Sequence, residues 1–205
     1  MPRERKSRAL HFEIGPIPES ADFHPESDGW LPLKKPSLWI AQMLAVPIAV
    51  AVSFVLIKAW ILIGGVGWSK TTLPLVFLPI LPGLLVVIPL HEVVHAVLHP
   101  HWGLSDATTL GVWPQRVVGY AHYRDELSRN RFMLILAAPF LVLSVVPLIL
   151  CTALSIAPPF VVALSIANGA GACVDLLGIA LLGIRLPSTA IVRNQGESTW
   201  WRNPA

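Results

Sequence analysis

The stretch HEVVH, residues 91–95, places two histidines four residues apart with a glutamate beside the first. On an α-helix, residues four apart share a face, so His91 and His95 can bind one metal ion while Glu92 stands beside it. Zinc suits two imidazoles, an oxygen ligand and a water. The pattern predicts a catalytic zinc site. A polar cluster that joins helices, a haem site and a metal-transport site use the same residue types.

A catalytic zinc ion needs a third protein ligand. Asp175 is the only acidic residue in the apolar run 160–184, where a carboxylate in a membrane costs about 2.5–3.5 kcal/mol. A metal would offset that cost, so we predict Asp175 as the third ligand. Asn168 is predicted to donate to the substrate or to an oxyanion.

Other residues near the motif could compete as the third ligand. His99 continues the row of His91 and His95, but three such residues span roughly 12 Å of helix and cannot all reach one ion. His101, with His99, is expected at the cytoplasmic interface. His122 and Glu126 lie in the polar segment 99–131, where such residues need no special reason.

The predicted chemistry is the hydrolysis of a peptide bond. Zinc lowers the pKa of its water toward about 7. Glu92 would take the proton of this water as it attacks the carbonyl, and would later return a proton to the leaving amine. A hairpin expected at about 108–123 could pair with an extended substrate, or could be an ordinary cytoplasmic loop.

The composition indicates a membrane protein. The 205 residues are 54% hydrophobic and 13% charged, against roughly 25% charged in an ordinary soluble domain. Four apolar runs, each long enough to span a bilayer, lie at about 38–63, 73–98, 132–156 and 160–184. We therefore expect an all-α membrane protein with about four transmembrane helices and a short cytoplasmic β-hairpin between the second and third. Prolines in the first half of the second run predict a short or broken helix there.

The positive charges predict the orientation. Of the 15 Lys and Arg residues, 13 lie in the N-terminal segment, in 99–131 or in the C-terminal segment. This bias places all three in the cytoplasm. The expected organisation is a cytoplasmic tail (1–37), a transmembrane metallopeptidase domain (38–184) and a second cytoplasmic tail (185–205), in the plasma membrane. The expected partners are the lipid bilayer and a membrane protein or peptide substrate. A net charge of +3 is too small to indicate nucleic acid.

Three stretches carry a resemblance to a known family. HEVVHAVLH, RNRFMLILAAPF and NGAGACVDLLGI resemble the zincin-type membrane metallopeptidases, a group that is similar to the site-2 intramembrane metalloproteases. The resemblance covers about 80–190. It implies a zinc-dependent peptidase that uses His91, Glu92, His95 and Asp175. The sequence CVDLL departs from the site-2 pattern because no glycine follows the aspartate, and those proteases usually carry more helices.

Two non-enzymatic classes share part of this pattern. A metal-binding membrane scaffold or pseudoprotease would keep the ligands, and a small transporter could hold a metal at its centre. Neither needs a base next to the ligands, so Glu92 favours the enzyme. The four apolar runs also lack the inverted repeat that is typical of transporters.

Overall fold

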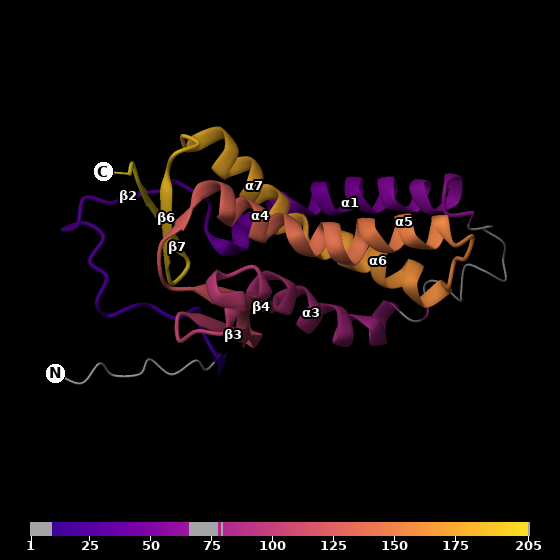
Figure 1. Cartoon of the computed structure of the whole chain (residues 1–205), viewed down its shortest axis with the longest axis horizontal. Helices are drawn as coiled ribbons and strands as arrows, with labels where there is room; N and C mark the ends of the chain where they lie inside the picture. The colour runs from indigo at the N-terminus through magenta and orange to yellow at the C-terminus, as the bar shows by residue number, and fades with distance from the viewer. Residues whose placement is uncertain (1–9, 66–77, 79, 205) are drawn as a thin grey trace. The chain divides into compact units, whose positions relative to one another are not determined.

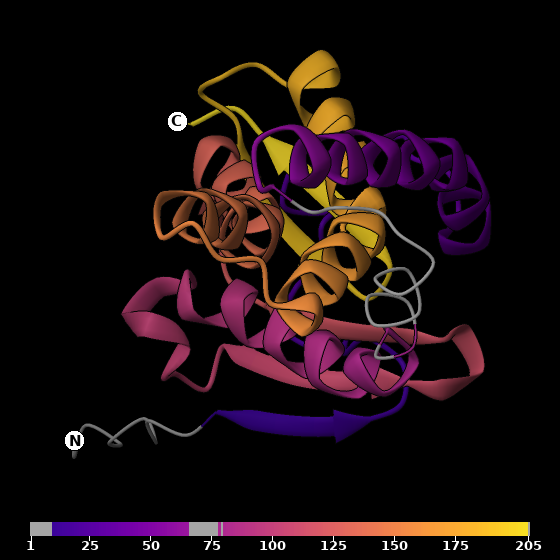
Figure 2. The same cartoon turned by 90° about the vertical axis from the view of Figure 1, so that its right-hand side faces the viewer.

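The structure, a computed structural model, describes residues 10–65, 78 and 80–204. The chain divides into two compact units, and Figures 1 and 2 show their elements. The sheet unit combines residues 1–39, 92–135 and 181–205. The helical unit combines residues 40–91 and 136–180. The chain therefore leaves the sheet unit twice and returns to it twice.

A three-stranded sheet forms one part of the sheet unit. It has the order β1-β3-β4 and contains β1 (His11–Ile14), β3 (Thr108–Trp113) and β4 (Val118–Tyr123). Strands β3 and β4 pair antiparallel around a turn that includes η2 (Pro114–Arg116). The hairpin expected at 108–123 is thus present. Strand β1 runs parallel to β3 and comes from the segment 1–37, in which the sequence predicted a tail and no strand.

A second, antiparallel sheet joins three distant segments of the chain. Its order is β2-β7-β6-β5, with β2 (Leu31–Pro32), β5 (Leu127–Ser128), β6 (Ile191–Gln195) and β7 (Ser198–Arg202). Phe23 and Trp30 are buried and meet edge to face, with ring centroids 5.3 Å apart. Arg193 lies over the ring of Phe23 and Arg202 over that of Trp30. These cation–π contacts attach the N-terminal segment to the C-terminal hairpin.

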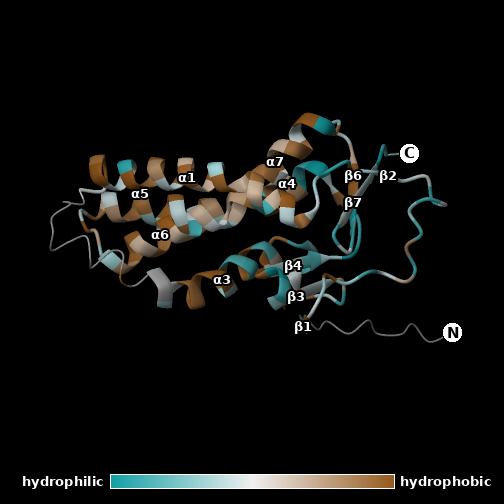
Figure 3. Cartoon of the chain, turned by 180° about the vertical axis from the view of Figure 1, so that it is seen from behind, coloured by the Kyte–Doolittle hydropathy of each residue, from teal (hydrophilic) through white to brown (hydrophobic). Residues whose placement is uncertain are grey.

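The helical unit is built from apolar helices. They include α1 (Leu38–Leu62), α5 (Val146–Ala153) and α6 (Pro159–Gly171), and Figure 3 shows hydrophobic residues along all three. Trp60 is fully buried at their centre, with Leu56, Cys151 and Val162 in the same core. Gly169 allows close packing here, because a Cβ at this position would lie 2.2 Å from a methyl carbon of Leu56. At Gly171, by contrast, an added Cβ would meet no neighbour within 4 Å.

The third apolar run forms one continuous helical segment. It consists of α4 (Arg129–Phe140), the π-helical turn η3 (Leu141–Val145) and α5. With α1, it is one of two described helices that are long and apolar enough to cross a membrane. Ser144, within the π-helical turn, is fully buried.

The expectation of an all-α protein with about four spanning helices is wrong, because the described residues form a mixed α/β structure with two sheets. Two helices qualify as spans, or up to three if the bent pair α6 and α7 (Cys173–Arg185) counts as one. Helix α3 (Ile80–Val97) is apolar but shorter. Of the broken helix expected in the first half of its run, residues 73–77 and 79 lie outside the described residues, and α3 is helical from Ile80 onward.

The fourth apolar run is divided by a bend of 43° between α6 and α7. Gly169 and Gly171 lie immediately before the break at Ala172. Glycine has about 1 kcal/mol less helix propensity than alanine, which makes this a favourable place for a helix to end. Hydropathy alone could not reveal the break, because the residues on both sides are equally apolar.

Two histidines of the sheet unit are buried in a neutral form. Burial lowers the pKa of His122 to about 4, with a smaller contribution from Arg193. Burial also lowers the pKa of His99 to about 3, and the nearby basic side chains of His95, His122 and Arg131 lower it further. The ring of His99 accepts or donates one hydrogen bond at Thr108 Oγ1, at 3.3 Å.

These buried histidines predict that acid destabilises the sheet unit. In the unfolded chain they gain protons below about pH 6.5, whereas in the fold they stay neutral to lower pH, so stability falls as the pH falls through this window. Between about pH 7.5 and about pH 5, we expect each of these two histidines to lower the free energy of unfolding by about 1–2 kcal/mol. Denaturant unfolding of the purified protein at both pH values measures this. His122→Gln should flatten the dependence, whereas the exposed His24→Gln should leave it unchanged; an equal slope in all three proteins would contradict the assignment.

Candidate metal centre

Helix α3 carries both motif histidines, one turn apart. The boundary between the two units falls within this helix, between His91 and Glu92. Because the helix is continuous, the positions of His91 and His95 relative to each other follow from α3 alone. The helix ends at Val97. The chain then turns back against the last turn of the helix at Gly103, which has a positive φ of 73°. A Cβ on Gly103 would lie 2.4 Å from the carbonyl oxygen of Ala96, so only glycine fits this return.

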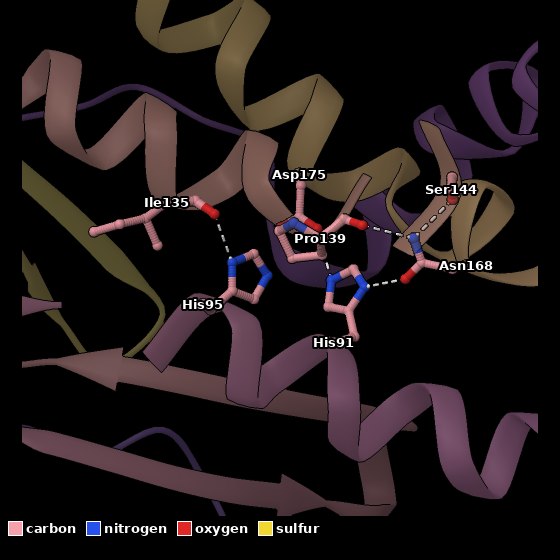
Figure 4. A network of polar contacts seen from close by, with 7 residues as sticks. All are labelled: His91, His95, Ile135, Pro139, Ser144, Asn168 and Asp175. Atoms are coloured by element: carbon pink, nitrogen blue, oxygen red, sulfur yellow. Dashed lines mark hydrogen bonds and ion pairs between the residues drawn. The ribbon is translucent and has the colours of Figure 1, made fainter. Parts of the chain in front are cut away.

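His91 contacts two polar side chains of the helical unit. Its Nε2 lies 3.0 Å from Oδ2 of Asp175, and its Nδ1 lies 2.9 Å from Oδ1 of Asn168. Figure 4 shows the ring held between these two groups. The side chains of His91 and Asp175 are 12% and 17% exposed, so the pair is largely shielded from water.

Asp175 lies in the first turn of α7, immediately after the bend. The sequence suggested that it lies near the centre of one long helix, and the structure corrects this. A carboxylate at a helix N-terminus is stabilised by about 0.3–1 kcal/mol through the helix dipole. The bend between α6 and α7 therefore lowers the cost of the charge, in addition to any contribution from a metal.

His95 is held by the main chain. Its Nδ1 lies 2.9 Å from the carbonyl oxygen of Ile135, within the sheet unit. A carbonyl can only accept, so Nδ1 carries the hydrogen and Nε2 keeps a lone pair. One ligand atom each from His91, His95 and Asp175 lies within 4.8 Å of the others, which makes these three a candidate metal-binding group.

The contact between His91 and Asp175 supports a cation at this position. If His91 carries its hydrogen on Nδ1, then Nε2 and the carboxylate oxygen are two acceptors only 3.0 Å apart. Two acceptors at this distance need a shared proton or a cation between them. Ligands of a tetrahedral zinc ion lie roughly 3.3 Å from each other, given metal–ligand distances of about 2.0–2.1 Å. The 3.0 Å between His91 and Asp175 is close to this value, and the set of two nitrogens and one oxygen within 4.8 Å is of the kind that zinc binds.

Glu92 lies against the β3–β4 hairpin. A Cβ on Gly119 of β4 would lie 3.1 Å from both Cγ and Oε1 of Glu92. The absence of a side chain at Gly119 thus makes room for the carboxyl group. Glu92 follows His91 directly on α3, so the predicted base and the predicted ligand are neighbours on one helix.

The competing ligand candidates have other contacts. His99 stacks at 5.2 Å on the ring of Tyr123, and Glu126 accepts a 2.8 Å hydrogen bond from Arg202. Among the described residues, the candidate metal-binding group contains none of His99, His101, His122 and Glu126. The groups that sequence reasoning missed are Ser144 and the carbonyls of Ile135 and Pro139; a backbone carbonyl has no sequence signal.

The fold and this group of residues define a mixed α/β protein with a candidate metal centre on an apolar helix. Residues 84–191, more than half of the chain, match the family described as "Putative zincin peptidase", and the chain belongs to this family. The matched segment contains His91, Glu92, His95 and Asp175. Membership suggests a metallopeptidase and implies zinc. No curated protein and no solved structure matches the chain.

Proposed function

We propose that this protein is a zinc-dependent membrane metallopeptidase in which His91, His95 and Asp175 hold the metal. The observation that carries the proposal is the convergence of their ligand atoms within 4.8 Å, with Glu92 next to the first ligand. A bound zinc ion supplies a Lewis acid that polarises a peptide carbonyl and lowers the pKa of water toward about 7. Zinc content and cleavage of a membrane substrate by the purified protein test the proposal together.

Glu92 is the general base in this proposal. Its carboxylate accepts a proton from the water that attacks the peptide carbonyl, and returns a proton to the leaving amine. The absence of a side chain at Gly119 leaves room for this carboxyl group beside β4. A scaffold or pseudoprotease would need the three ligands but not this base, and a wild-type protein that binds zinc but cleaves no membrane protein would favour that class.

Strand β4 is a suitable place for the substrate. It lies at the edge of the order β1-β3-β4 formed by the described strands, and an extended peptide can pair with such an edge through main-chain hydrogen bonds. Gly119, within β4, is the residue that contacts Glu92. A peptide added along β4 would therefore pass close to the proposed base.

The membrane setting is part of the proposal. Helices α1 and α4–α5 are long and apolar enough to span a bilayer, and the polar segments that carry 13 of the 15 Lys and Arg residues belong to the sheet unit. Sheet pairing joins those segments, which supports the proposal that they lie on one side of a membrane. The positive charges favour the cytoplasm, and peptide hydrolysis near that face would resemble site-2 intramembrane metalloproteases.

This topology predicts where added reporters appear. A reporter fused at the C-terminus or inserted at the hairpin turn near Pro114 should be cytoplasmic, whereas one inserted between α5 and α6, at Ala157, should be on the opposite side. Paired phosphatase and fluorescent-protein fusions read out the two sides. Opposite sides for the C-terminus and the hairpin would contradict the proposed orientation.

A further inference from the structure

Asn168 lies at the centre of a buried hydrogen-bond network in the helical unit. The residue is fully buried. Its Nδ2 donates to the carbonyl oxygen of Pro139 at 2.9 Å and to Oγ of Ser144 at 2.8 Å, and its Oδ1 lies 2.9 Å from Nδ1 of His91. Figure 4 shows these three contacts around the amide. Both amide hydrogens and the amide oxygen of Asn168 therefore have named partners.

The partners determine which way the amide points. The carbonyl of Pro139 can only accept a hydrogen bond. The hydroxyl of Ser144 donates its hydrogen to the carbonyl oxygen of Ser165 at 2.8 Å, so its Oγ accepts from Asn168. A flipped amide would place Oδ1 against the Pro139 oxygen, two acceptors without a hydrogen. The amide nitrogen must face Pro139 and Ser144, and the amide oxygen must face His91.

A second set of contacts holds Ser144 in this role. Ser165 donates back to the carbonyl oxygen of Ser144 at 3.0 Å, and the indole nitrogen of Trp60 donates to Oγ of Ser165 at 3.1 Å. Trp60, Ser144 and Ser165 are all fully buried. Ser144 belongs to the π-helical turn η3. Such turns occur often at functional sites. The network therefore has few alternative arrangements, because each buried donor already has its acceptor.

The orientation of Asn168 determines the hydrogen on His91. The oxygen of an amide can only accept, so Nδ1 of His91 must donate and carries the hydrogen. The other ring nitrogen, Nε2, is then the one that faces Oδ2 of Asp175 at 3.0 Å, where a zinc ion or a shared proton must lie between the two atoms. Nitrogen ligands of metals are commonly oriented by such an acceptor on their other ring nitrogen, and losing it typically costs 10–100-fold in metal affinity.

We propose that Asn168 is a positioning residue of the metal centre, which holds His91 in the Nδ1–H tautomer and presents Nε2 to the ion. This proposal rests on the proposed metal site. It gives Asn168 a role different from the predicted oxyanion donor, because both of its amide hydrogens are used within the helical unit. Ser144 acts through Asn168, by accepting one of those hydrogens.

Two substitutions separate this role from a general effect on folding. Asn168→Leu removes the acceptor for His91 and both donors. Asn168→Asp also removes both donors but keeps an oxygen facing Nδ1 of His91, as in the carboxylate–histidine pairs of known zinc sites. Both variants should lose stability, but only the leucine variant should bind zinc 10–100-fold more weakly in competition with a chromophoric chelator. Ser165→Ala is the matched control, since it disturbs the same network without contacting His91.

The tautomer itself can be measured on the protein with saturating zinc, in which the metal takes the place of a proton between His91 and Asp175. Histidine-specific ¹⁵N NMR of the full chain at about pH 9, above the ordinary titration range of histidine, should show His91 protonated at Nδ1 in the wild type and in Asn168→Asp. Asn168→Leu should show a mixture, and His91→Gln assigns the signal. A wild-type His91 protonated at Nε2, or a leucine variant with unchanged tautomer and zinc affinity, would overturn the proposal. If the wild type binds no zinc but its His91 still carries a hydrogen on Nδ1, the metal site fails while the positioning of His91 by Asn168 stands.

Discussion

Substitution of Glu92 by glutamine should abolish cleavage and leave the zinc ion in place. Glutamine is nearly isosteric with glutamate and can still form hydrogen bonds, but it cannot accept a proton from water at neutral pH. General-base catalysis typically contributes a factor of about 10²–10⁴, so we expect a loss of that size or more. Zinc content and the cleavage rate of a membrane substrate should be measured on the same preparation. The uncleaved substrate should accumulate with this variant.

The matched control for this experiment is Glu126→Gln. It makes the same chemical change in the sheet unit, at a side chain that pairs with Arg202 near the protein surface. Cleavage by the control should stay close to that of the wild type. Full cleavage by the Glu92 variant, with full zinc content, would exclude Glu92 as the base.

Removal of a metal ligand should have the second large effect. His91→Ala or His95→Ala should abolish stable zinc binding, because the two remaining ligands hold a catalytic ion poorly. Asp175→Ala should weaken binding strongly, since it removes the only oxygen ligand of the proposed set. Metal analysis after dialysis against a weak chelator measures all three.

The control for the ligand variants is His101→Ala. His101 is exposed, follows α3 in the turn η1 (Pro100–Gly103) and lies outside the candidate group. Its loss should leave the zinc content unchanged. Unchanged zinc in Asp175→Ala would instead place the third ligand elsewhere, and His122 and Glu126 would then be the residues to replace.

The local features of the sequence predicted much of the site. A helical spacing of four residues places His91 and His95 on one face without any knowledge of the fold. The turn at Pro114 and the β-forming residues around it likewise predicted the β3–β4 hairpin. Asp175 could be singled out because a carboxylate is costly in an apolar run. The structure brings Asp175 to His91 at 3.0 Å, whereas its catalytic use stays a prediction.

The features that the sequence did not reveal depend on distant partners. Strand β1 pairs with β3 across about a hundred residues, and β2 pairs with β7 across an even longer separation. Short strands of this kind have little local signal, so the terminal segments looked irregular and the fold looked all-α. The bend before Asp175 was missed for another reason: hydropathy is continuous across Ala172, and only the backbone changes direction.

His91 and His95 each donate a hydrogen bond to an acceptor, and the two acceptors differ in how well they tolerate substitution. His95 donates to the main-chain carbonyl of Ile135, and every amino acid supplies such a carbonyl. His91 donates to the side chain of Asn168, which few residue types can replace. Among relatives, the amino acid at position 135 should therefore vary within the limits of packing, whereas the amino acid at position 168 should vary little. A search for distant relatives with the same centre should require an asparagine seven residues before the aspartate, and should leave the residue that supports His95 unspecified.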